Sequence, residues 1–149
     1  MENSRCPEWR DILERCGLKV TQDAAPRDVT PVQTAIYAVT GFEVEPEAAI
    51  PISSSKAIGE LDQQWHHHAS MISLYSESRE FLIVPPAPGG SKIGWIQVRD
   101  PVGDHLPSRI AAATGSPEFL AISLDGRHLC AVSVEEDDYW VVLHEFNYG

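Results

Sequence analysis

The sequence is poor in cysteine and contains no long apolar run. Its three cysteines, Cys6, Cys16 and Cys130, are odd in number and lack CxxC spacing, which argues against a disulfide framework. No stretch approaches the roughly 20 apolar residues of a membrane helix. The charged amino terminus also lacks the apolar segment of a secretory signal. The sequence therefore predicts reduced thiols and a cytoplasmic protein.

Basic residues are also scarce. The chain carries 11 Lys and Arg residues against 22 Asp and Glu residues, for a formal net charge of −11 at pH 7. Such a charge repels a phosphate backbone, so we expect no direct binding of nucleic acid. The acidic residues are spread along the chain without an acidic tail. Composition alone leaves two interpretations open: the charge only keeps the protein soluble, or it attracts a basic partner.

Familiar catalytic motifs are missing. The chain has no GxSxG and no HExxH sequence, and its glycine-rich segment at residues 88–91 lacks the lysine of a P-loop. Cys130 could be paired with His128 or His144 as a nucleophile and base. A small cysteine in an apolar strand is usually structural, however. We therefore predict a protein that is not an enzyme, with no catalytic residue and no cofactor.

The run His66-His67-His68 raises the question of a metal site. Consecutive histidines point in different directions on a helix or a strand, so at most two could share an ion. Metal sites on regular elements favour i,i+2 or i,i+4 spacing with carboxylate or thiolate partners. We expect a polar helix-to-strand junction without metal here. A small ligand-binding or metal-dependent enzymatic domain that uses this run is the alternative.

Residues 117–146 predict a three-stranded antiparallel meander, around which the rest of the chain is organised. The three apolar runs are Phe119–Leu124, Arg127–Val134 and Tyr139–Phe146. Asp125-Gly126 separates the first two and is typical of a two-residue hairpin turn. Four carboxylates, Glu135–Asp138, separate the last two and predict an acidic turn in solvent, because they cannot enter a core.

The remaining patterns predict a single α+β domain over residues 1–149. Helical spacing, Pro starts and Gly stops indicate helices at residues 7–17, 30–41, 53–65 and 107–114. Strands are expected at residues 18–22, 70–76, 81–84 and 93–98, with a short edge strand within 42–51. We predict one antiparallel sheet of five to seven strands with two to four helices packed on one face.

The acidic turn lies beside two large aromatic residues at a strand entrance. Tyrosine and tryptophan are concentrated in the hot spots of protein interfaces. Only one of two adjacent rings can face the core on one side of a strand, so we expect the other to be exposed. These residues form the predicted partner-binding set: Glu135, Glu136, Asp137, Asp138, Tyr139 and Trp140.

The acidity, the size and the tail LDGRHLCAVSVEEDDYWVVLHEF resemble bacterial immunity proteins that neutralise polymorphic or contact-dependent toxins. Such proteins are typically small, acidic, cytosolic single domains without catalytic motifs. The resemblance implies tight binding to one cognate toxin enzyme, often by covering a basic active site. It assigns no functional residue. A structural adaptor, or a homodimer formed through an edge strand, is a further alternative.

Overall fold

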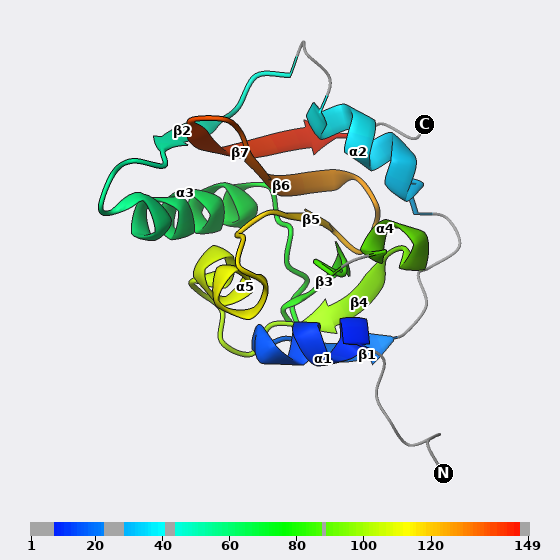
Figure 1. The fold of residues 1–149 in the computed structure, drawn as a ribbon. Helices are drawn as coiled ribbons and strands as arrows, with labels where there is room; N and C mark the ends of the chain where they lie inside the picture. Colours follow the sequence, from blue (N-terminus) through cyan, green and yellow to red (C-terminus); the bar gives the residue numbers. More distant parts are fainter. Residues whose placement is uncertain (1–7, 23–28, 41–43, 88, 147–149) are drawn as a thin grey trace.

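The computed structural model describes residues 8–22, 29–40, 44–87 and 89–146. It contains one seven-stranded antiparallel sheet with the strand order β1-β4-β3-β5-β6-β7-β2 (Figure 1). The strands are β1 (Lys19–Gln22), β2 (Ala48–Pro51), β3 (Glu80–Val84), β4 (Ile96–Arg99), β5 (Phe119–Ile122), β6 (His128–Val134) and β7 (Asp138–Glu145). The helices are α1 (Glu8–Arg15), α2 (Val32–Thr40), α3 (Ala57–Met71), α4 (Gly90–Ile93) and α5 (Leu106–Thr114). The predicted α+β fold is confirmed.

Helices cover both faces of this sheet. α1, α3 and α5 pack on one face, and α2 packs on the other (Figure 1). In β5, Phe119 and Ala121 belong to the core between the sheet and α1, α3 and α5. Leu120 and Ile122 belong to the core between the sheet and α2. Successive side chains of a strand point to opposite faces, so a strand buried on both sides is a continuous apolar run. The expectation that the helices cover one face is therefore wrong. The described residues form five helices where two to four were predicted, and the short α4 was not predicted.

The carboxyl-terminal meander of β5, β6 and β7 is confirmed, with Ala121 opposite Cys130 and Val132 opposite Val141. The first turn differs from the prediction of a two-residue Asp-Gly turn. The Ser123 N–H bonds to the His128 carbonyl at 2.9 Å, which leaves a four-residue loop, 124–127. Only Gly126 in this loop has a positive φ, of 74°. Four-residue hairpin loops are commonly built around a type I turn, which does not need positive φ at Asp125.

The strand predicted at residues 70–76 is wrong, as is the helix end predicted at Trp65. α3 continues through the histidines to Met71. Trp65 and Ala69 are both buried and lie four residues apart, so the apolar face of the helix continues past the polar run. The helix ends where Ser73 adopts a left-handed φ of 57° and the Leu74 N–H bonds back to the Ala69 carbonyl at 3.0 Å.

The other predicted elements are confirmed with small shifts in their ends. α1, α2 and α5 occupy the predicted helical segments, and β1, β3 and β4 the predicted strands. Gly17 and Gly115 have positive φ values just after α1 and α5, as expected for helix stops. β2 lies at the sheet edge beside β7. Within the ranges described above, no helix has the length and apolar character needed to cross a membrane.

A buried ion pair joins α5 to the loop after β4. The Asp100 side chain is fully buried, and its carboxylate lies 2.8 Å from a guanidinium nitrogen of Arg109. The Val102 and Gly103 N–H groups also donate to this carboxylate, each at 3.2 Å. Arg109 donates in addition to the Cys16 carbonyl at 2.7 Å. This guanidinium therefore connects the end of α1, the end of β4 and α5.

Replacing Tyr75 with phenylalanine is expected to stabilise the protein by about 1 kcal/mol at neutral pH. The Tyr75 hydroxyl is buried and has no hydrogen-bond partner in the part of the chain that the structure describes. Burial, reinforced by the nearby Asp100 charge, raises the pKa of Tyr75 well above its usual value. Unfolding experiments in urea at neutral and alkaline pH measure the effect.

The pH dependence of this gain follows from the direction of the pKa shift. An unfolded tyrosine loses its proton near pH 10, whereas folded Tyr75 keeps it to higher pH. Below about pH 10 the tyrosine is protonated in both states, so its ionisation does not affect the free energy of unfolding. Above about pH 10 only the unfolded tyrosine releases its proton, so the wild type loses stability as the pH rises. The Tyr75→Phe variant should lack this alkaline loss. A variant that is less stable than the wild type at neutral pH would show that the hydroxyl is satisfied.

Candidate partner-binding surface

The acidic turn, Glu135–Asp138, connects β6 to β7 and is held by backbone hydrogen bonds on two sides. The Glu135 N–H donates to the Asp138 carbonyl at 2.8 Å and closes the hairpin. The Ile52 N–H, just after β2, donates to the Asp137 carbonyl at 3.0 Å. Asp138 is the first residue of β7 and lies opposite Pro51. The turn therefore has a fixed backbone at the junction of three strands.

The side chains of the acidic turn face solvent to different degrees. Glu136 and Asp137 are exposed, whereas Glu135 and Asp138 are half-buried. The Ser133 hydroxyl donates to the Glu135 carboxylate. Among the described residues, none of the four carboxylates lies in an ion pair. The turn therefore carries negative charge that forms no ion pair with a described cation, and its role in binding a partner remains a prediction.

Tyr139 and Trp140 point to opposite faces of the sheet, and both are half-buried. Tyr139 packs against the core beneath α3, and Trp140 packs against the core beneath α2. The expectation that one of these rings would be exposed is therefore wrong, because helices cover both sheet faces. Glu136 and Asp137, and not the adjacent rings, are therefore the side chains most open to a partner.

Glu118 adds a fifth carboxylate that the sequence analysis did not select. Its Oε2 accepts the Val134 N–H at 3.0 Å, immediately before the acidic turn. The register of the meander explains this position: Phe119 lies opposite Val132, so Glu118 lies beside the end of β6. The position of Glu118 could have been predicted from the meander, since an acidic residue directly preceding β5 must lie near the end of β6.

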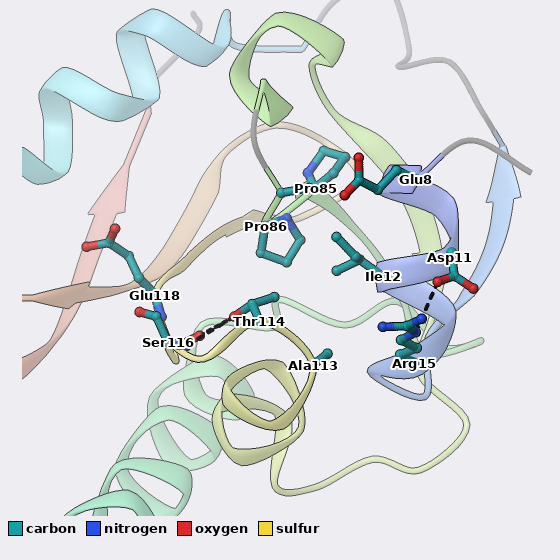
Figure 2. Close-up of a pocket in the computed structure, with 11 residues that line it drawn as sticks. Glu8, Asp11, Ile12, Arg15, Pro85, Pro86, Ala113, Thr114, Ser116 and Glu118 are labelled. Atoms are coloured by element: carbon teal, nitrogen blue, oxygen red, sulfur yellow. Dashed lines mark hydrogen bonds and ion pairs between the residues drawn. The ribbon is translucent and has the colours of Figure 1, made fainter.

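A pocket of about 600 Å³ lies next to Glu118, between α1 and the end of α5 (Figure 2). We call it the acidic pocket, because Glu8, Asp11 and Glu118 line it with one basic residue, Arg15. Figure 2 shows Glu8 and Asp11 on α1 and Glu118 on the far side of Pro86. The Arg15 guanidinium lies 3.0 Å from the Asp11 carboxylate, so this cation is already paired. The lining retains a net negative charge.

The histidine run lies inside α3, not at a helix-to-strand junction as expected. His66 and His67 are exposed, and His68 is half-buried. Burial, and then the neighbouring His67, lower the pKa of His68, while Glu47 opposes the shift. Over the described ranges, no group of three or more His, Cys, Asp or Glu residues is arranged to hold a metal ion. The geometry of the helix thus gives the metal alternative no support.

Cys130 lies in the middle of the sheet and is fully buried. Burial raises the pKa of its thiol well above the usual value, so the thiolate that a nucleophile requires is disfavoured. Burial also raises the pKa of Cys16 to about 11, although the Arg109 charge opposes this shift. His144 is exposed on β7 and its ring packs against Phe146, with ring centroids 4.5 Å apart. These environments are those of structural cysteines.

Comparison with known proteins gives this chain no significant match among protein-family models, curated proteins or solved structures. The arguments for function therefore come from the chemistry of the surface itself.

Proposed function

We propose that the protein is a cytoplasmic inhibitor of the immunity-protein type, which binds and neutralises a cationic partner, a cognate toxin enzyme. The observation that carries this proposal is the acidic turn together with Glu118. These carboxylates are fixed at one end of the sheet, and no cation among the described residues pairs with them. The net charge of −11 and the resemblance to toxin-immunity proteins agree with it.

Electrostatic attraction gives this surface a specific kinetic role. A concentrated negative field steers a cationic partner and raises the association rate by roughly 10–1,000-fold over an uncharged surface. The field is screened over a Debye length of about 8 Å at physiological salt. Binding through the acidic turn should therefore be fast at low salt and should slow steeply as salt is added.

The alternative of a homodimer formed by strand pairing has less support. The sheet edges are β1 and β2, each four residues long. β1 carries an irregularity between Val20 and Gln22, and β2 ends with Pro51. Short, irregular or proline-containing edges are devices that prevent pairing between chains. The edges are therefore poor surfaces for self-association.

Neutralising the acidic turn with Gln and Asn is expected to slow association with the partner by roughly tenfold and to weaken its salt dependence. Dissociation should change less, because a screened rim charge acts mainly on the encounter. Affinity purification from the producing cell, followed by mass spectrometry, supplies the partner. Surface-binding kinetics at low and high salt then measure both rates for the wild type and for the variant.

A matched control removes the same amount of charge elsewhere. The control uses four of the exposed acidic residues outside the turn: Glu14, Glu77, Asp104 and Glu145. Neutralising them should have a smaller effect on the association rate than neutralising the acidic turn. Equal slowing by both variants would mean that only net charge matters. No slowing by the turn variant would remove the acidic turn as the recognition surface.

A further inference from the structure

A second pocket, predominantly apolar, lies between the end of α2 and the sheet. Its volume is about 300 Å³. The apolar residues whose side chains face α2 and line this pocket come from α2, β3, β5 and β6: Ile36, Val39, Val84, Leu120 and Ala131. We call it the apolar pocket. A space of this size suits a bulky apolar side chain such as leucine or phenylalanine.

The apolar pocket lies on the sheet face that α2 covers, and the acidic pocket lies on the face that α1 and α5 cover. The two pockets meet around one end of the sheet, beside the acidic turn. Pro85, Pro86 and Glu118 line both pockets and separate them. Ser133 lines the apolar pocket, and its hydroxyl donates to Glu135 in the acidic turn. The strand register explains this arrangement, since the end of β3, the start of β5 and the end of β6 lie at the same end of the sheet.

The charge on and around the apolar pocket is predominantly negative. Glu118 lies at its border, the acidic turn follows β6 on one side, and the acidic pocket lies on the other. Arg15 is the one basic side chain among the described residues that line either pocket, and Asp11 pairs with it. An occupant complementary to this surface is apolar at its centre and positively charged on both sides.

We propose that this surface binds a segment of the cationic partner in which an apolar side chain enters the apolar pocket between flanking lysine or arginine residues. This inference rests on the proposed function and extends it from charge to a defined sequence pattern. The two parts of the surface have different roles. The carboxylates set the association rate, and the desolvated apolar side chain sets the dissociation rate, as central anchors do in protein interfaces.

Selection of a phage-displayed library of random peptides on the folded, full-length protein tests the pattern. The retained peptides should share an apolar residue with lysine or arginine on both sides. Fluorescence polarisation of one labelled, selected peptide then gives its affinity for the protein and for its variants. Peptides that share no basic residues, or failure to retain any peptide sequence, would overturn the inference.

Variants that fill the apolar pocket supply the decisive comparison. Thr40 is exposed and lines the pocket, so Thr40→Trp should fold and should block it; Ile36→Trp fills it from the adjacent turn of α2. Each is expected to weaken binding of the selected peptide by about tenfold or more. The control is Tyr37→Trp, on the same helix but 74% exposed and outside the pocket lining, which should change affinity by less than about twofold. Circular dichroism verifies the fold of each variant.

The results separate this inference from the proposed function. Basic peptides that depend on the acidic turn but bind equally well to Thr40→Trp and Ile36→Trp would overturn the apolar anchor and leave the cationic partner in place. Peptides that depend on the pocket but not on the acidic turn would overturn the charged flanks. If neutralising the acidic turn also leaves the association rate of the partner unchanged, the proposed function is overturned together with this inference.

Discussion

Replacing Arg109 with methionine is expected to lower the free energy of unfolding by about 3–5 kcal/mol. The reason is the Asp100 carboxylate, which is fully buried and lies 2.8 Å from the Arg109 guanidinium. Two backbone N–H groups also bond to the carboxylate, but they cannot neutralise its charge. A buried charge that loses its partner keeps the full cost of its desolvation. Urea unfolding followed by circular dichroism measures the loss.

Two further variants test the cause of this loss. Asp100→Asn in the Arg109→Met background removes the unpaired charge and should recover part of the stability. Arg15→Met is the surface control: the Arg15 side chain is 65% exposed, and its pair with Asp11 should contribute about 0–1 kcal/mol. A loss in Arg109→Met no larger than in Arg15→Met would contradict a buried, energetically coupled pair.

The carboxyl-terminal meander could be predicted from sequence because its signals are local. Apolar runs of strand length, interrupted by Asp-Gly and by four carboxylates, specify strands and turns without reference to the rest of the chain. The failed prediction that one of Tyr139 and Trp140 would be exposed had a non-local cause. It required knowing that α2 packs on the sheet face opposite α3, and this position is not encoded within the strand.

The histidine run led to the wrong prediction of the end of α3. His66 and His67 are exposed, so they interrupt the apolar pattern in the sequence without interrupting the helix. The i,i+4 spacing of Trp65 and Ala69 carried the correct signal. The alternation that follows Ala69 favoured a strand, but the packing of α3 on the sheet determined the structure instead.

The candidate site could be predicted only in part, for the same reason. The acidic turn is a contiguous segment and is visible in the sequence. The two pockets combine α1, α2 and the Pro85-Pro86 segment, which are far apart along the chain. Glu118 could be predicted in part, because the register of a predicted hairpin places it beside the acidic turn.

Replacing Trp65 with alanine is expected to cost about 3–5 kcal/mol of unfolding free energy. Trp65 is 1% exposed, and its ring lies between Phe119 and Tyr75, with centroid distances of 5.1 and 6.2 Å. Alanine would leave a large cavity between α3 and the sheet. This substitution should therefore have one of the largest effects in the chain, whereas alanine at the exposed His67 on the same helix should change stability by no more than about 0.5 kcal/mol.

Phenylalanine at position 65 separates two contributions of the tryptophan. The Trp65 Nε1–H is buried and has no hydrogen-bond partner among the residues that the structure describes. An unsatisfied buried donor costs about 1–3 kcal/mol, and Trp65→Phe removes this cost while keeping an aromatic ring in the core. The loss should therefore stay below about 1.5 kcal/mol, well short of the alanine variant. If urea unfolding gives equal losses for Trp65→Phe and Trp65→Ala, the Nε1–H is satisfied in solution and the indole itself is required.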